Sequence, residues 1–140
     1  MRNKRYQESL DHEILTADPV RLIQMLYRGA VDSITTARRS LKLGDIRARS
    51  RAISKAMAIV TELSLSLNHT MGGDLSKNLA ELYAYAEKLL IQANWEQSDA
   101  PLAEAECLLS TLLEGWPSEK QAAQNGVLAG QSIPSTLVSS

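Results

Sequence analysis

The chain repeats apolar residues every three or four positions in four stretches, the spacing that places them on one face of an α-helix. The first stretch predicts a helix from Pro19 to Leu43. Asp18 suits its N-cap, Pro19 its first turn, and Gly44 the left-handed residue after its end. The apolar positions of its predicted buried face are Val20, Ile23, Tyr27, Ala30 or Val31, Ile34, Ala37 and Leu41.

The second stretch predicts a helix from Ile46, capped by Asp45, to about Leu67. The third predicts a helix from about Leu75 to Ala93 or Asn94. In the second, the apolar arc is broader than packing against two neighbours usually requires. In the third, the face opposite the predicted core is also apolar where a solvated helix would be charged. The residues that widen these faces are Ala52, Ala56, Ile59 and Leu63 in the second helix, and Ala80, Ala84 and Ile91 in the third.

The fourth stretch begins at Asp99-Ala-Pro101 and reaches Trp116, where Pro117 ends it. Helices joined by turns this short pack as antiparallel neighbours, so the predicted fold is all-α, an antiparallel up-down four-helix bundle spanning 18–117. We expect residues 1–17 to form an N-terminal arm. We expect residues 118–140, rich in Ser, Gln, Gly and Ala, to be a disordered C-terminal tail.

Composition agrees with a helical, cytoplasmic protein. Phe is absent and aromatic residues make up 4% of the chain, so aliphatic side chains must fill the core. The single cysteine, Cys107, cannot form an internal disulfide, and no N-terminal apolar stretch resembles a signal peptide. No apolar run is long enough for membrane insertion. We therefore expect the reducing cytoplasm.

The two halves of the chain differ in charge. Residues 1–55 carry 12 Lys and Arg against 6 Asp and Glu, whereas residues 56–140 carry 3 against 10. The densest basic stretch is either a solvated helix face or a docking patch for an acidic partner, with Arg47, Arg49 and Arg51 as its candidates. Nucleic acid is disfavoured because the overall balance is acidic and no aromatic residues interleave with the basic ones.

No constellation in the sequence predicts an enzyme, a metal site or a cofactor. Neither His12 nor His69 has a second ligand at helical spacing, and Gly72-Gly73 lacks the residues of a phosphate loop. Cys107 has no base beside it and is expected to be buried and inert. The alternative function is a non-catalytic signalling or scaffold bundle of the phosphotransfer kind. In such a bundle the phosphorylated histidine lies in the middle of a helix, whereas His69 is predicted to lie in a glycine-containing loop.

The broad apolar faces of the second and third helices exceed what one bundle core needs. Such an excess is typical of a surface that binds an amphipathic helix. A generous core and a homodimer face explain the same pattern, and helical periodicity alone does not separate these three interpretations.

The stretch TADPVRLIQMLYRGA, residues 16–30, resembles the first-helix signature of the flagellar secretion chaperone FliS family. Arg28 falls on a variable position of that signature and Gly29 on its glycine, where we expect a close helix contact. Further agreement in order and spacing covers about residues 6–116. It comprises Tyr6-Gln7, LGDIRARSRAISKAMAIVTELSLSLN, GGDLSKNLAELYAYAEKLLIQAN and Trp116.

This resemblance implies a cytoplasmic chaperone that binds the disordered C-terminal segment of flagellin, prevents its premature polymerisation and delivers it to the flagellar type III export apparatus. It also implies that the arm, through Tyr6 and Ile14, covers the binding groove before the client arrives. Ala86, Glu87-Lys88 and Pro117 depart from the family pattern. Our predicted client-binding residues are Ile59, Leu63, Leu67, Leu75, Asn78, Leu79, Leu82 and Tyr83.

Overall fold

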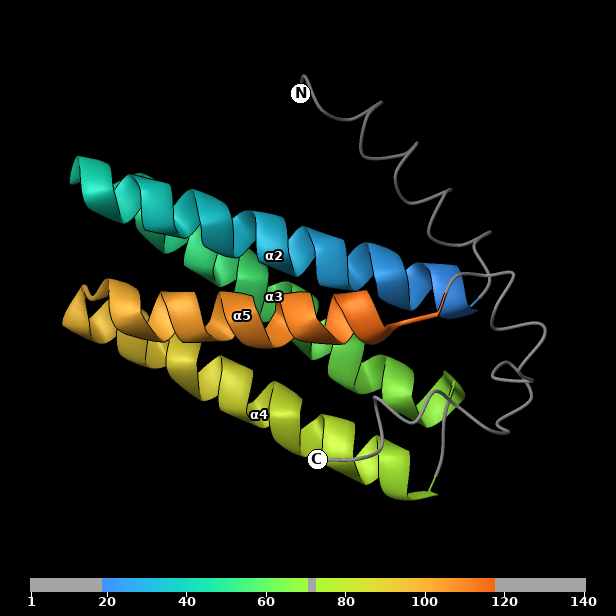
Figure 1. The fold of residues 1–140 in the computed structure, drawn as a ribbon. Coiled ribbons are helices and arrows are strands. Elements are labelled where there is room, and N and C mark those ends of the chain that lie inside the picture. Colours follow the sequence, from blue (N-terminus) through green and yellow to red (C-terminus); the bar gives the residue numbers. More distant parts are fainter. Residues whose placement is uncertain (1–18, 71–72, 118–140) are drawn as a thin grey trace.

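The computed structural model describes residues 19–70 and 73–117, which form four long helices (Figure 1). These helices are α2 (Pro19–Leu43), α3 (Ile46–Thr70), α4 (Gly73–Glu96) and α5 (Asp99–Gly115). The observed bounds of α2 match the prediction. The predicted bounds of α3 and α4 were short by two or three residues, because the ends of those helices carry little apolar periodicity.

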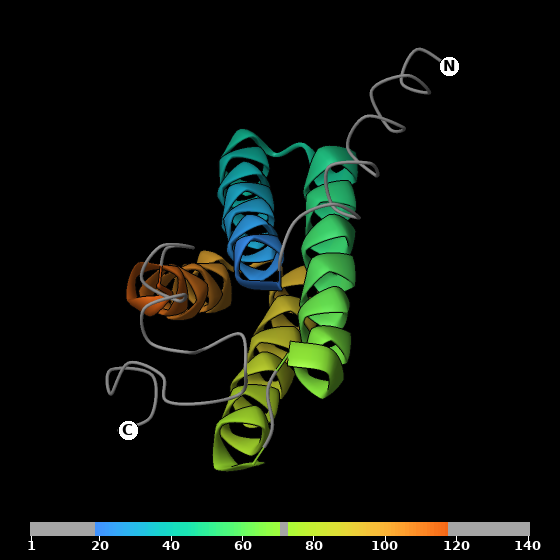
Figure 2. The same cartoon turned by 90° about the vertical axis from the view of Figure 1, so that its right-hand side faces the viewer.

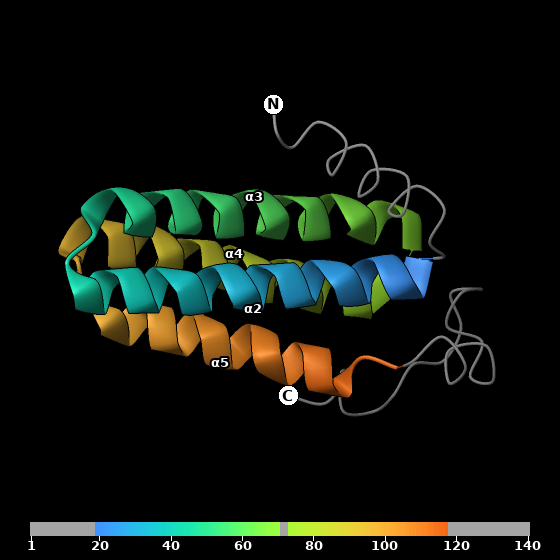
Figure 3. The same cartoon turned by 90° about the horizontal axis from the view of Figure 1, so that it is seen from above.

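The helices form a ring in which each packs against its neighbour in the chain and α5 returns to α2. The end-on view shows α2, α3, α4 and α5 at four successive corners (Figure 2). Seen from above, α2 and α3 run side by side in opposite directions, joined by a tight turn at one end (Figure 3). This confirms the predicted all-α, antiparallel four-helix bundle. The predicted arm at 1–17 and tail at 118–140 lie outside the described residues.

The turn between α2 and α3 forms as its sequence predicts. Gly44 adopts a left-handed conformation with φ of 74° and donates its N–H to the Leu41 carbonyl at 3.1 Å. The Asp45 carboxylate then accepts the backbone N–H of Ala48 at 3.0 Å, which caps α3. A two-residue connection of this kind forces α2 and α3 to lie antiparallel and in close contact.

Three aromatic side chains meet in the centre of the bundle. The hydroxyls of Tyr27 on α2 and Tyr83 on α4 share a buried hydrogen bond of 2.6 Å, although these helices occupy opposite corners. The Tyr27 ring also packs edge-on against Trp116, with ring centroids 5.8 Å apart. The Trp116 indole donates a hydrogen bond to the Val20 carbonyl at 2.9 Å, which fastens the end of α5 to the start of α2.

Burial changes the acidity of both tyrosines. The pKa of Tyr27 is raised far above the ordinary tyrosine value. Desolvation by burial is the larger cause, and the nearby Tyr83 is the smaller one. Desolvation also raises the pKa of Tyr83 to about 12. Both hydroxyls are therefore neutral across the physiological range, and the hydrogen bond between them needs no charge.

A charged cluster joins α2 to α5 on the surface. The Arg38 guanidinium contacts Asp99 at 2.8 Å and Glu106 at 2.6 Å, and the Thr35 hydroxyl donates to the same Glu106 carboxylate. The hydrogen bonds from Arg38 lower the pKa of Asp99 below its ordinary value. Because Arg38 and Asp99 are substantially exposed, the ion pair between them adds little to the stability of the fold.

We predict that Tyr27→Phe lowers the free energy of unfolding by about 1–3 kcal/mol, because it leaves the buried Tyr83 hydroxyl without a partner. The double variant Tyr27→Phe/Tyr83→Phe should lose less than the sum of the two single losses, since it removes both hydroxyls. Urea unfolding of the four proteins followed by circular dichroism measures this coupling. Additive losses would contradict a functional hydrogen bond between the two residues.

A pH dependence follows from the same pair. Unfolded tyrosine releases its proton near pH 10.0, whereas Tyr83 in the folded chain keeps its proton to about pH 12. The unfolded state therefore binds fewer protons in this range, so the stabilisation is complete below pH 10 and declines as the pH rises. The free energy of unfolding should fall less steeply between these pH values in Tyr27→Phe/Tyr83→Phe than in the natural chain.

Candidate functional site

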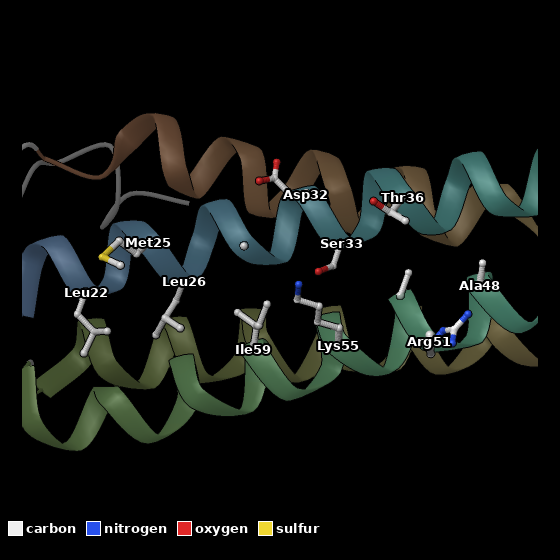
Figure 4. Close-up of a pocket in the computed structure, with 12 residues that line it drawn as sticks. Leu22, Met25, Leu26, Asp32, Ser33, Thr36, Ala48, Arg51, Lys55 and Ile59 are labelled. Carbon is white, nitrogen blue, oxygen red and sulfur yellow. The ribbon is translucent and has the colours of Figure 1, made fainter. Parts of the chain in front are cut away.

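An open groove of about 840 Å³ runs along the side of the bundle between α2 and α3 (Figure 4). Residues of both helices form its floor and walls. They are Leu22, Met25, Leu26, Gly29, Asp32, Ser33 and Thr36 on α2, and Ala48, Arg51, Ala52, Lys55 and Ile59 on α3.

The two halves of the groove differ in chemistry. Near the beginning of α2, Leu22, Met25 and Leu26 face the groove, and Ile59 continues this apolar surface on α3 (Figure 4). Toward the α2–α3 turn the lining becomes polar, with Lys55 on α3 and several hydroxyl or charged side chains beyond it. The groove therefore offers an apolar surface for a hydrophobic stripe, followed by a partly basic segment.

Gly29 brings the floor of the groove close to α3. A Cβ atom at this position would lie 3.2 Å from the Ile59 Cδ1 atom. This distance is tighter than an ordinary van der Waals contact, so a side chain larger than hydrogen needs Ile59 to move. The close helix contact expected at Gly29 is thus present, and the glycine also keeps the groove open.

The sequence builds the groove from a second apolar stripe on α2. Ile23 and Tyr27 point into the core and are fully buried, whereas Leu22 and Leu26 are only partly buried beside them. Our sequence analysis assigned α2 a single buried face and missed the groove residues Leu22, Met25 and Leu26. The signal was the nearly continuous apolar run LIQMLY, because adjacent apolar residues point about 100° apart on a helix.

Most of the residues predicted to bind a client on α3 and α4 lie in the core. The facing sides of these two neighbouring helices pack against each other, which removes their side chains from the surface. Asn78 and Leu82 are partly exposed on α4 but lie outside the groove, and Ile59 is the one predicted residue that lines it. The buried members are Leu63, Leu67, Leu75, Leu79 and Tyr83.

Two of the three arginines of the predicted docking patch are exposed, and the third is buried. Arg47 and Arg51 are exposed, but Arg49 is only 5% exposed and its Nε atom has no hydrogen-bond partner among the described residues. Arg49 precedes Ala52 and Ile53 by three and four positions, which places it on the core face of α3. Arg49 is therefore not available to a surface patch, whereas Arg47 and Arg51 are.

Cys107 is exposed, so the expectation of a buried thiol was wrong; the residue falls on the outer side of α5. Tyr6, Ile14 and His12, together with the side chain of His69, lie outside the part of the chain that can be described. Within that part, no three metal-ligating side chains come together. None of its helices is both long and apolar enough to cross a membrane.

Comparison with known proteins shows the family of this chain. A family model described as "Flagellar protein FliS" matches residues 1–124. The chain is 38% identical over 111 residues to the flagellar secretion chaperone FliS of Salmonella typhimurium, covering 79% of this chain and 82% of that one.

Two further relatives match the chain at lower identity. The identity is 33% over 114 residues to the flagellar secretion chaperone FliSB of Pseudomonas aeruginosa, covering 81% of this chain and 90% of the relative. It is 30% over 120 residues to FliS of Bacillus subtilis, covering 86% of each chain. The chain belongs to the FliS family of flagellar secretion chaperones.

Proposed function

We propose that this protein is a cytoplasmic flagellar export chaperone that holds the disordered C-terminal segment of flagellin in the groove between α2 and α3. Binding there prevents premature polymerisation, and the complex delivers flagellin to the flagellar type III export apparatus. The groove with its apolar half is the observation that carries this proposal. The secretion-chaperone names of the relatives support it. The role is binding without catalysis.

The dimensions of the groove suit one amphipathic helix. Its lining on α2 extends from Leu22 to Thr36, which corresponds to about 21 Å, or four helical turns, at 1.5 Å per residue. A client helix of this length presents apolar residues at intervals of three and four along one side. Those residues would pack on Leu22, Met25 and Leu26, while Arg51 and Lys55 favour acidic client side chains at the other end.

The same arrangement permits release of the client. Ordering a disordered segment on binding costs about 2–5 kcal/mol or more of the gross interaction free energy. The apolar contact must offset this cost, which explains why the groove extends over several turns. An affinity limited in this way allows the export apparatus to take the client from the chaperone.

Before the client arrives, the arm at 1–17 covers the groove through Tyr6 and Ile14 in this proposal. The position of the arm in the chain supports the idea, since it directly precedes α2 and the groove begins at Leu22. Docking on the export apparatus is assigned to the remaining basic patch. Arg47 is its most informative member, because Arg51 also lines the client groove.

We predict that Met25→Asp weakens binding of a peptide from the C-terminal segment of the same organism's flagellin by at least about tenfold. The bound client would remove water from the introduced carboxylate, and the apolar half of the groove offers that carboxylate no hydrogen-bond or charge partner, so binding is weakened. Isothermal titration calorimetry measures the affinity, and circular dichroism tests whether the free chain keeps its helices.

The matched control is Leu65→Asp, which places the same charge on an exposed position of α3 outside the groove. This control should bind the peptide like the natural chain. Equal affinities of all three proteins would exclude the α2–α3 groove as the binding site, and a lack of binding by the natural chain would contradict the proposed function.

Gly29 supplies a second test through size rather than charge. We predict that Gly29→Leu fills the groove beside Ile59 and weakens peptide binding by about tenfold or more, while the helical content is retained. Gly29→Ala is the matched control. Its gain of about 1 kcal/mol in helix propensity is opposed by the tight approach to Ile59, so its free energy of unfolding should change by less than about 1 kcal/mol.

A further inference from the structure

Three large apolar side chains are exposed at one end of the bundle. Leu43 is 75% exposed, Ile46 60% and Trp95 87%, although burying such residues is normally favourable. Leu43 and Ile46 flank the turn that joins α2 to α3, and Trp95 is the second-last residue of α4. We call this end of the bundle, residues 38–51 and 91–99, the tip.

The two segments of the tip lie together because successive helices run in opposite directions. The turn between α2 and α3 and the turn between α4 and α5 are at the same end of the bundle (Figure 3). Two contacts join them. The Ser50 hydroxyl on α3 donates to the side-chain oxygen of Asn94 on α4 at 3.4 Å, and Arg38 on α2 contacts Asp99 on α5 at 2.8 Å. The tip is therefore one surface to which all four helices contribute.

Basic side chains surround the apolar ones. Residues 38–51 carry six Lys and Arg against one acidic residue, and residues 91–99 add two acidic residues. The side chains of Arg39, Arg47 and Arg51 make no ion pair or hydrogen bond with any described residue. The tip thus has an excess of positive charge, although the net charge of the whole chain is −1.

Several acidic residues lie toward the opposite end of the bundle. On α3, Glu62 is 16 positions beyond Ile46, a separation of about 24 Å at about 1.5 Å per residue. Asp74 and Glu114 lie at the far ends of α4 and α5. The Debye length is about 10 Å at about 0.1 M salt, so these carboxylates are screened from a charged surface that meets the tip. An anionic surface would therefore attract the bundle end-on.

The chemistry and shape of the tip fit the headgroup region of a lipid bilayer. Trp and aliphatic side chains enter this region, and neighbouring Lys and Arg extend their alkyl stems along it while their charged ends reach the phosphates. Leu43, Ile46 and Trp95 project from separate helix ends and do not form a stripe along one helix. A partner helix in a groove cannot cover such a set, whereas a fluid lipid surface adapts to it.

From this combination we propose that the tip binds the surface of a membrane rich in anionic phospholipid. Leu43, Ile46 and Trp95 enter the headgroup region, and the surrounding Lys and Arg contact lipid phosphates. The contact is peripheral and reversible, because three side chains bury too little apolar area for permanent anchoring. The α2–α3 groove runs along the side of the bundle and stays open. The proposal does not rest on the flagellar function.

The test is flotation of the full-length chain with lipid vesicles on a density gradient. The chain should float with vesicles of equimolar phosphatidylcholine and phosphatidylglycerol, which are anionic, and should not float with vesicles of phosphatidylcholine alone. Added salt should weaken the binding, because it screens the basic side chains from the lipid phosphates.

A pair of charge variants locates the contact. Lys42→Glu/Arg47→Glu should lower the partition coefficient onto the anionic vesicles by at least about tenfold, since each basic residue near such a surface contributes about fivefold. Arg28→Glu/Lys77→Glu is the matched control. It makes the same change in net charge at two exposed positions away from the tip, and its binding should stay within about twofold of the natural chain.

A second pair of variants tests the apolar part of the contact. Trp95→Ser should lower the partition coefficient by about tenfold, because the indole is the largest side chain available to the headgroup region. Leu65→Ser, at an exposed apolar position of α3 far from the tip, should bind like the natural chain. Vesicles should shift the tryptophan emission of the natural chain to shorter wavelength. This shift should be absent in Trp95→Ser, whose remaining Trp116 is already buried.

A natural chain that does not float with the anionic vesicles would overturn the proposal, even if it binds an acidic polypeptide such as polyglutamate. So would an equal loss of binding in the control charge variant, or binding that is indifferent to Trp95→Ser. Circular dichroism checks that each variant keeps its helices. Lys42, Arg47 and Trp95 do not line the groove, so their variants should keep the natural affinity for the flagellin peptide, which separates this test from that of the proposed function.

Discussion

The hydrogen bond between Tyr27 and Tyr83 is the interaction on which the arrangement of the bundle depends. It joins α2 to α4 across the centre, and Trp116 adds the end of α5 through its contacts with Tyr27 and Val20. Two hydroxyls buried without partners would destabilise the fold, so each must find the other. The pair therefore sets which face of α2 points inward. The neighbouring stripe of α2 is left at the surface as one wall of the groove.

The groove is a consequence of that orientation and of one missing side chain. Because Tyr27 points into the core, Leu22, Met25 and Leu26 line the groove next to α3 and are not covered by it. Gly29 leaves space that a Cβ would take from Ile59. The glycine that weakens α2 as an isolated helix thus keeps the groove between α2 and α3 open. The residues that stabilise the bundle and those that line its groove alternate along the same helix.

The fold was predictable because its signals are local. Pro19, Gly44 and Asp45 mark helix ends through the conformations and hydrogen bonds available to them. The proposed binding groove was not predictable in the same way. Leu63 and Tyr83 were assigned to a client surface because they lie at the edges of broad apolar faces, yet both are fully buried. Arg49 was assigned to a basic patch by its neighbours in sequence, although its helical position directs it inward.

For the described residues, the sequence by itself determined the four helices, both ends of α2, the start of α3 and the antiparallel order, together with the family to which the chain belongs. Each of these follows from spacing, capping residues, short turns or a continuous motif. Only the tertiary structure decided which of two adjacent apolar stripes is core and which is groove. The physical reason is that hydrophobic periodicity records how wide an apolar face is, whereas burial depends on which neighbouring helices cover it. The neighbouring helices leave the face of α2 that carries Leu22 and Leu26 partly uncovered, and they leave Ile91 and Trp95 of α4 exposed.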